Sequence, residues 1–229
     1  MSLAAALARA RISGSLASPP TPLTLAEGYV VAAALYPLLG TPLGWKVGAT
    51  SAGAQAFLGT TEPIRGRLYG ERIWYAGDAD ISGSRPCEVE PEVVLRAGAD
   101  LAFDAAWFGI ELNRSSFAEP FAHGVGAVVA DNAASVGLLI GPAIPLAALD
   151  DPASLVATIL ADGIEVARGA GDAVLDDPRR AYDWLRSCVE LRPGDLVATG
   201  AMGRSAVVAR GTRLKLDAGR FGTALFTLK

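Results

Sequence analysis

The stretch Cys87-Glu88-Val89-Glu90-Pro91-Glu92-Val93-Val94-Leu95 carries the strongest structural signal in this chain. Its valines and its alternation of charged and apolar residues predict a β-strand, and alternate side chains of a strand point to the same face. Glu88, Glu90 and Glu92 therefore share one face. Two carboxylates about 4 Å apart repel by roughly 1 kcal/mol in water and by roughly 4 kcal/mol at an effective dielectric of about 20. A hard divalent cation offsets such repulsion, and a solvated strand face is the alternative.

A second strand is predicted over Trp107-Phe108-Gly109-Ile110-Glu111-Leu112, and it carries a single acid among apolar residues. A carboxylate in such surroundings is rarely left unpaired. Glu90, Glu92 and Glu111 could together supply an all-oxygen site for Mg²⁺ or Mn²⁺, with positions left for water or substrate. Alternation alone leaves Glu88 as a further candidate.

The composition sets limits on the class of protein. The 229 residues are 51% hydrophobic, which suffices for one large domain or for a domain with a small appendage. A net charge of −4 gives no general basis for binding nucleic acid or an anionic membrane. The two cysteines are 101 positions apart (188 minus 87), so neither a metal-binding motif nor a disulfide framework is expected. We therefore expect a cytoplasmic location. The uncharged stretches 28–45 and 132–149 are broken by prolines and are expected to be core elements rather than membrane spans.

The order of apolar and polar residues along the chain predicts a helical appendage over residues 1–43 and a largely antiparallel β domain over residues 44–229. Strands and helices do not alternate regularly as in βαβ units, so an α+β fold is expected. Helices are predicted over 3–12, 25–38 and 177–188. Strands are predicted over 44–50, 66–74, 89–101, 107–112, 125–130, 136–140, 155–161, 164–168, 196–199, 206–209, 213–216 and 224–228. The apolar N-terminal helices also suggest self-association.

Several common catalytic motifs do not occur in the sequence. It contains neither a phosphate-binding loop nor a dinucleotide-type glycine triplet. The only histidine, His123, is not accompanied by a Gly-x-Ser-x-Gly motif and is interpreted as a packing or surface residue. Scattered cysteines and one histidine argue against a zinc site.

Lys46 lies in the short glycine-bracketed segment Gly44-Trp45-Lys46-Val47-Gly48. The chain has 20 lysines and arginines, of which only Lys46, Lys215 and Lys229 are lysines. A compact and titratable ammonium differs in chemistry from a planar guanidinium, which makes Lys46 a candidate functional residue. A lysine that extends from the end of a strand into solvent is the alternative.

Taken together, six segments resemble the 2-keto-4-pentenoate hydratase branch of the fumarylacetoacetate hydrolase superfamily. In order they are 44–51, Glu90-Pro91-Glu92 with Asp100-Leu101, Gly109-Ile110-Glu111, Ala130-Asp131-Asn132-Ala133, 177–185, and Leu191-Arg192-Pro193-Gly194-Asp195 through Thr199-Gly200. The resemblance implies a mixed β-roll fold with Mg²⁺ held by Glu90, Glu92 and Glu111, and Mn²⁺ as the alternative ion. It also implies that Lys46 lies in the active site, with Thr199 and Gly200 near the substrate.

The activity implied by the resemblance is that of a lyase, a hydratase of a small 2-hydroxydienoic or 2-oxo acid in the catabolism of aromatic compounds. A homo-oligomer is expected. A 4-oxalocrotonate-type decarboxylase, an acylpyruvate- or fumarylacetoacetate-type C–C hydrolase and a non-catalytic binding or scaffold subunit remain alternatives. Hydrolytic relatives activate water with a His–Glu pair on an N-terminal lid, and this chain has no histidine before His123, which counts against the hydrolase.

The chain departs from the family pattern in two places. Relatives often follow the third glutamate with Asp-x-Arg, where this chain has Asn113-Arg114-Ser115-Ser116. Hydratases often carry an acid in a Pro-Asp-Phe-Gly loop, where this chain has Pro63-Ile64-Arg65-Gly66. Both changes remove an acid and add an arginine. Arg65 and Arg114 are therefore candidates to bind the second carboxylate of a diacid substrate, and two solvent-facing arginines are the alternative.

Overall fold

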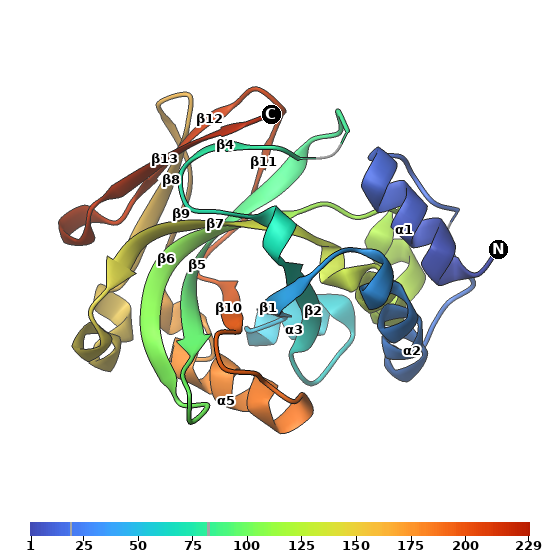
Figure 1. Cartoon of the computed structure of the whole chain (residues 1–229), viewed down its shortest axis with the longest axis horizontal. Coiled ribbons are helices and arrows are strands. Elements are labelled where there is room, and N and C mark those ends of the chain that lie inside the picture. The colour runs from blue at the N-terminus through green and yellow to red at the C-terminus, as the bar shows by residue number, and fades with distance from the viewer. Residues whose placement is uncertain (19, 82) are drawn as a thin grey trace.

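A computed structural model describes residues 1–18, 20–81 and 83–229 of the chain, which form two β-sheets and a group of helices at one end (Figure 1). The helices are α1 (Leu3–Ser13), α2 (Leu25–Leu35), α3 (Ala52–Leu58), α4 (Gly124–Ala130) and α5 (Pro178–Cys188). The first seven strands are β1 (Pro42–Gly48), β2 (Ile64–Tyr69), β3 (Ile73–Trp74), β4 (Gly77–Ala79), β5 (Cys87–Ala97), β6 (Phe103–Asn113) and β7 (Ser135–Ile144). They are followed by β8 (Val156–Ala161), β9 (Ile164–Ala170), β10 (Leu196–Ala201), β11 (Ala206–Val208), β12 (Arg213–Asp217) and β13 (Thr223–Leu228).

The larger sheet has the strand order β2-β1-β10-β5-β6-β7-β3, with β11 also paired to β5, and the smaller sheet has the order β4-β13-β12-β8-β9. Within the described ranges, β1–β10, β3–β7 and β4–β13 are parallel pairs and the other pairings are antiparallel. The predicted α+β class with a mixed, largely antiparallel β-roll is therefore confirmed. The larger sheet is strongly curled in Figure 1, with β5 and β6 as its longest strands.

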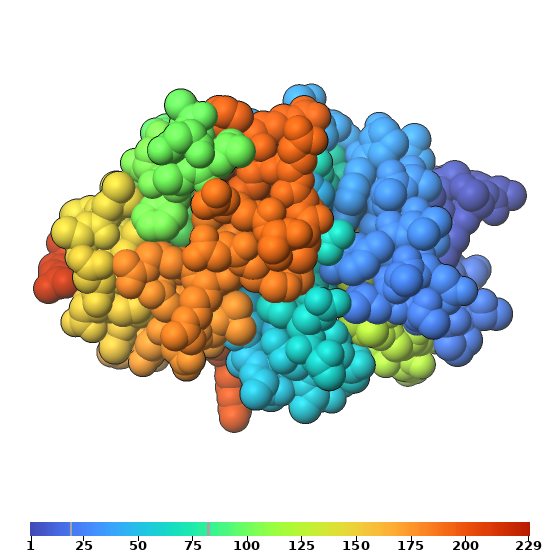
Figure 2. Space-filling view, turned by 90° about the horizontal axis from the view of Figure 1, so that it is seen from below, coloured from blue at the N-terminus to red at the C-terminus, as the bar shows by residue number. Residues whose placement is uncertain are grey.

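The two faces of the larger sheet bury different apolar clusters. One face, with Val93, Leu95 and Phe108, packs against the smaller sheet and α5. The opposite face buries a smaller cluster that includes Val94 and Leu138. Burying a side chain of this size contributes roughly 1.5–3 kcal/mol. Seen from below, the orange segment that carries α5 covers the middle of the molecule, beside the blue segment that carries α2 (Figure 2).

Local sequence signals fix the N-terminal helices. The Ser2 side chain accepts from the main chain of Ala5 at the start of α1, and Gly14 ends that helix in the left-handed conformation. A capping box between Thr24 and Glu27 opens α2. None of the helices in the described ranges is long and apolar enough to cross a membrane. The division of the chain at residues 43 and 44 into two units stays a prediction.

The segment 125–130 was predicted as a strand, and this prediction is wrong because the segment belongs to α4. A short apolar run in a sequence fits a strand and a buried helix equally well, and the element that packs against it determines which of the two forms. Here the partner is α2, and a side chain at Gly28 would overlap the main chain of Gly126. The helix α3 was not predicted. The predicted strand 66–74 is divided into β2 and β3 by a short helical turn at Gly70–Arg72.

Candidate metal centre

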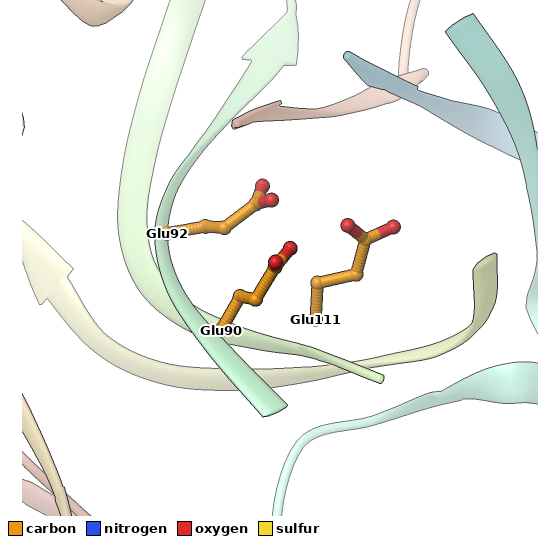
Figure 3. A group of neighbouring side chains, drawn as sticks. All are labelled: Glu90, Glu92 and Glu111. Carbon is orange, nitrogen blue, oxygen red and sulfur yellow. The ribbon is translucent and has the colours of Figure 1, made fainter. Parts of the chain in front are cut away.

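Three glutamates on neighbouring strands converge on one face of the larger sheet. β5 and β6 are antiparallel with Glu90 opposite Glu111 and Glu92 opposite Gly109, so period-two alternation places the three acids on the same face. One carboxylate oxygen from each glutamate lies within 4.8 Å of the others. Figure 3 shows the three carboxylates pointing into a common space. The side chains of Glu92 and Glu111 are fully buried.

Gly109, opposite Glu92, lies where the sheet is tightly packed. A Cβ at this position would lie 2.8 Å from Val94 Cγ2 and 3.1 Å from the carbonyl oxygen of Leu139, both of which would have to move. A larger residue here would therefore displace the Val94 side chain and push β6 away from β7, beside the positions that carry the glutamates.

A single ammonium group and two neutral donors surround the carboxylates. Lys46 Nζ lies 3.1 Å from Glu111 Oε2, and the lysine side chain is 6% exposed. Asn113 Nδ2 donates to Glu90 Oε2 at 2.9 Å and to Glu111 Oε2 at 3.1 Å. The main-chain N–H of Gly200 donates to Glu92 Oε2 at 3.1 Å. Each glutamate is thus oriented by at least one donor.

The acceptor atoms that remain fit a cation. Glu92 Oε1, Glu111 Oε1 and Asn113 Oδ1 are buried and have no hydrogen-bond partner among the described residues. A buried acceptor without a partner costs roughly 1–3 kcal/mol. Three carboxylates face one ammonium, so the cluster also carries an excess of negative charge. A hard divalent cation would satisfy the oxygens and the charge together, and these residues therefore fit Mg²⁺ or Mn²⁺.

Burial and the closeness of the carboxylates also shift the pKa values of the cluster. Burial, with the neighbouring Glu111 carboxylate, raises the pKa of Glu90 to about 7. The same two causes raise the pKa of Glu92 well above its usual range. Burial by itself lowers the pKa of Lys46, but the carboxylates of Glu111, Glu90 and Glu92 outweigh burial, so the pKa is raised overall and the lysine stays charged.

The other predicted site residues fall into two groups. Gly200 reaches the cluster through its main-chain N–H, whereas the Thr199 hydroxyl donates to the carbonyl oxygen of Val93 at 2.9 Å. Glu88 pairs with Asn113 at the end of β5 but does not belong to the group of three converging acids. His123 lies at the end of a helical turn, edge-on to the Phe117 ring.

The structure does not bring Arg65 and Arg114 to the glutamates. Arg65 is opposite Val47 and Lys46 is opposite Gly66 on paired strands, so the arginine and the lysine project from opposite faces. The Arg65 guanidinium stacks 4.1 Å over the Tyr29 ring. Arg114 Nη1 donates to the carbonyl oxygen of Arg85 at 3.1 Å. Their role in substrate binding stays a prediction without support from this geometry.

Two residues of the centre were not predicted to belong to it. Asn113 lies two positions after Glu111 on the same strand, so alternation could have identified it as a neighbour. Ile64, at the second position of Pro63-Ile64-Arg65-Gly66, is buried on the Lys46 side of β2, since a Cβ at Gly48 would contact both side chains. The position of Ile64 beside Lys46 follows from the register of β1 and β2, which the sequence pattern does not predict.

Comparison with known proteins identifies the family. The family model described as fumarylacetoacetate (FAA) hydrolase C-terminal matches residues 119–229. The chain is 31% identical over 207 residues to 2-keto-4-pentenoate hydratase 1 of Dechloromonas aromatica (strain RCB), which covers 80% of this chain and 77% of that protein. The chain belongs to the 2-keto-4-pentenoate hydratase branch of the fumarylacetoacetate hydrolase superfamily. A 2-keto-4-pentenoate hydratase of Burkholderia vietnamiensis (strain G4 / LMG 22486) is 30% identical over 188 residues, 74% of this chain and 72% of that protein.

Solved structures agree on the fold of this hydratase-branch chain. 4-Oxalocrotonate decarboxylase from Pseudomonas putida G7, complexed with magnesium and adipate, has a TM-score of 0.85 at 22% identity and covers 99% of this chain and 96% of that one. Fumarylpyruvate hydrolase from Pseudomonas aeruginosa, in complex with Mn²⁺ and pyruvate, has a TM-score of 0.63 at 18% identity, with 82% and 89% covered. Superfamily members are metal-dependent enzymes, and this chain is an enzyme of that superfamily.

Proposed function

We propose that this enzyme is a divalent-cation-dependent lyase that adds water to a small 2-hydroxydienoic or 2-oxo acid with one carboxylate. The observation that carries the proposal is the convergence of Glu90, Glu92 and Glu111 beside the buried ammonium of Lys46. The relatives named 2-keto-4-pentenoate hydratase support the reaction class. Mg²⁺ is the proposed ion and Mn²⁺ the alternative.

The three glutamates would hold the cation, which supplies a Lewis acid that polarises the C2 oxygen of the substrate and stabilises negative charge there. Asn113 keeps Glu90 and Glu111 in one orientation through its amide N–H groups. Lys46 has further N–H groups beyond the one near Glu111, and these can bind the substrate carboxylate or move a proton at Nζ.

A monocarboxylate is proposed because the surroundings of the cluster are apolar. The cluster shares its face with the buried side chains of Val94 and Leu138. Among the described residues, Lys46 is the one cation that lowers the pKa values of Glu90 and Glu92. A second substrate carboxylate placed there would lack a partner, which is costly in a buried site, so a diacid is expected only if that carboxylate is lost as CO₂.

Decarboxylation is the second candidate, and Ile64 is the observation that favours it. This side chain is 2% exposed and lies beside Lys46, at a position where the resemblance to hydratases implies an acid. Adding water requires a group that takes a proton from water and a group that returns one to carbon, whereas loss of CO₂ leaves an enolate that needs stabilisation and one proton, which Lys46 Nζ could donate. Among the described residues, Lys46 is the ionisable group beside the three glutamates, which suits the reaction with fewer proton transfers.

A two-substrate assay with Mg²⁺ separates the candidates. A hydratase should remove the ultraviolet absorbance of 2-hydroxypenta-2,4-dienoate without release of CO₂, and a decarboxylase should release CO₂ from a 2-oxohexenedioate. Turnover of neither compound with Mg²⁺ or Mn²⁺ would contradict both proposals. Stabilisation against heat by Mg²⁺ and oxalate together is expected of a catalytic site, and no stabilisation by either is expected of a scaffold.

We also propose, from the sequence, a cytoplasmic homo-oligomer. Exposed apolar side chains such as Val30 on α2 and Phe57 on α3, which are 72% and 68% exposed, support self-association. Sedimentation analysis of the purified chain tests this, and a monomer at micromolar concentration would contradict it.

A further inference from the structure

The larger sheet is curled so far that its two ends come together. Its strand order ends with β2 on one side and with β7 and β3 on the other. Leu68 of β2 is nevertheless buried in one cluster with Leu138 of β7 and Ile73 of β3. Among the described residues no strand pairs with the second edge of β2, and a cavity of about 50 Å³ lies between α1, β2 and β7. The roll therefore has a seam between β2 and β7, where strand pairing does not hold its ends together.

The side chain of Asn132 crosses this seam. Its Oδ1 accepts from the main-chain N–H of Arg67 at 2.6 Å, and its Nδ2 donates to the carbonyl oxygen of Arg67 at 3.0 Å. A residue on a neighbouring antiparallel strand would make the same pair of bonds. Nδ2 also lies 3.3 Å from the carbonyl oxygen of Ser135, the first residue of β7. The Asn132 amide, which is buried, thus takes the place of a strand pair between the two ends of the sheet.

The main chain around Asn132 is strained and is held from both sides. Asn132, Ala133 and Ala134 have φ values of +56°, +48° and +63°. Successive residues in the left-handed region are unfavourable unless they are glycine, and such strain persists only where surrounding contacts fix it. On one side the contacts are the two bonds to Arg67, and on the other the main-chain N–H of Arg114 donates to the Ala134 carbonyl oxygen at 2.8 Å. The segment therefore spans from β2 to the residue that follows β6.

One side of the seam leads to Lys46. Lys46 is opposite Gly66, and Gly66 is the neighbour of Arg67 on β2. Opposite residues of paired strands share a face, so a Cβ at Gly66 would project from the face that carries Lys46. That Cβ would lie 2.5 Å from the carbonyl oxygen of Asn132. The strained segment therefore packs directly against β2 on the lysine face.

The other side of the seam leads to Glu111. Asn113, two positions after Glu111 on β6, is opposite Ser135 of β7. In the other direction around the sheet, Lys46 and Glu111 are connected through β1, β10, β5 and β6. The Asn132 amide closes the second connection, so the strands form a ring around the cluster. The distance of 3.1 Å between Lys46 Nζ and Glu111 Oε2 is then fixed from both directions.

We propose that Asn132 is a positioning residue, which closes the seam and thereby holds Lys46 beside Glu111. This role rests on the proposed function, in which Lys46 binds the substrate carboxylate or moves a proton. The three glutamates lie on β5 and β6, which pair with each other directly and do not need the seam. Loss of the Asn132 amide should therefore impair catalysis and leave binding of the cation largely intact.

Asn132→Gly tests the hydrogen bonds rather than the main chain, because it removes the amide and glycine adopts a positive φ without strain. Ala134→Gly is the matched control, since it relaxes the same segment and keeps the amide. In Asn132→Gly, kcat for the compound that the wild type turns over should fall at least about tenfold, and the Kd for Mg²⁺, measured by calorimetry, should change less than about threefold. Ala134→Gly should change both quantities less than about twofold.

Acylation of the lysines gives a second readout, which needs no turnover. Lys46 is 6% exposed, whereas the only other lysines, Lys215 and Lys229, are 40% and 53% exposed and serve as internal references. In the Mg²⁺-loaded protein, Asn132→Gly should raise the rate at which acetic anhydride modifies Lys46, relative to the references, at least about tenfold by mass spectrometry. A wild type that turns over neither compound would reject the proposed function, and this ratio would then decide whether Asn132 holds Lys46.

Three results would overturn the proposal. Equal losses of kcat in Asn132→Gly and Ala134→Gly would show that the stiffness of the segment matters and not the amide. A loss of Mg²⁺ affinity as large as the loss of kcat would show a general disturbance of the centre. An unchanged kcat, or unchanged acylation of Lys46, would show that the seam does not hold the lysine. If Asn132→Gly fails to fold, Asn132→Asp replaces it: aspartate tolerates the left-handed conformation, keeps the acceptor for Arg67 and loses the donor, and the same difference between kcat and Mg²⁺ affinity is expected.

Discussion

Lys46 Nζ and Glu111 Oε2 lie 3.1 Å apart, and both side chains are almost completely buried. Taking two charges out of water is expensive, and an isolated buried pair often contributes no net stability. This pair is joined to two more carboxylates, which leaves the cluster negative. We therefore interpret the Lys46–Glu111 pair as part of a site for a cation and its substrate rather than as a source of stability.

Removing one partner of this pair should be more harmful than removing both. Lys46→Met leaves three carboxylates, two of them fully buried, without a cation and should destabilise the metal-free protein by roughly 3–5 kcal/mol. The double variant Lys46→Met with Glu111→Gln should recover much of that loss, measured by urea unfolding. Strictly additive effects of the two changes would show that the pair does not interact.

Glu92→Gln should have opposite effects on stability and on metal binding. The pKa of Glu92 is raised well above its usual range, so a neutral glutamine removes an unfavourable charge and should stabilise the metal-free protein. The same change should weaken Mg²⁺ binding at least about 100-fold, measured by calorimetry. Glu88→Gln is the matched control on the same strand and should change neither quantity, because Glu88 lies outside the cluster.

The stability of the metal-free protein should fall as the pH rises. The folded-state pKa of Glu90 is about 7, above the ordinary value near 4.3, so the folded state binds a proton more tightly than the unfolded state. Stability from this group is therefore present at low pH and is lost as the pH rises through about 7. The expected loss between about pH 5.5 and about pH 8 is roughly 1–3 kcal/mol, and saturating Mg²⁺ should reduce it. Urea unfolding at both pH values checks this, and greater stability at the higher pH would contradict it.

Asn113 should act as a positioning residue. Asn113→Leu removes the donors that hold Glu90 and Glu111 together, and should weaken Mg²⁺ binding by roughly 10–100-fold. Asn113→Asp should destabilise the metal-free protein by adding a fourth acid to the cluster, and Mg²⁺ should reverse part of that loss. An unchanged Mg²⁺ affinity in Asn113→Leu would show that the bridge is not needed.

Gly200→Ala should damage both the loop and the metal centre. Gly200 has a φ of +121°, and a Cβ there would overlap the Thr50 side chain, so the N–H that orients Glu92 would have to move. We expect a loss of about 1–3 kcal/mol in the free energy of unfolding together with weaker Mg²⁺ binding. Gly53→Ala is the control, since a Cβ at this helical position meets open space. Equal stabilities of the two variants would contradict the prediction.

The sequence was sufficient for those parts of the centre that depend on local alternation. The period of two in 87–95 places Glu90 and Glu92 together, and an isolated acid in 107–112 indicates a buried partner. The register that sets Glu90 opposite Glu111 cannot be predicted from the sequence of either strand, because it depends on packing of the whole sheet. For the same reason, the sequence could not show that Arg65 points away from the glutamates. Arg65 is one position from Gly66, the residue opposite Lys46, and therefore projects from the other face of the sheet.

Tertiary context accounts for the errors in secondary structure. Residues 125–130 have the valines of a strand, but they form a helix because α2 approaches them closely at Gly28 and Gly126. The cavity lined by Arg11, Leu68 and Gly137 could not have been predicted, because it joins residues from α1, β2 and β7 that are far apart in the chain. Contacts between distant segments leave no periodic signal in the sequence.

Crystals grown with Mn²⁺ test the central claim most directly, through the anomalous scattering of the ion. The account predicts one ion at roughly 2.0–2.3 Å from one oxygen of each of Glu90, Glu92 and Glu111, with Lys46 Nζ beside it. Acids turned toward solvent with no ion between them, in crystals that contain Mn²⁺, would contradict it.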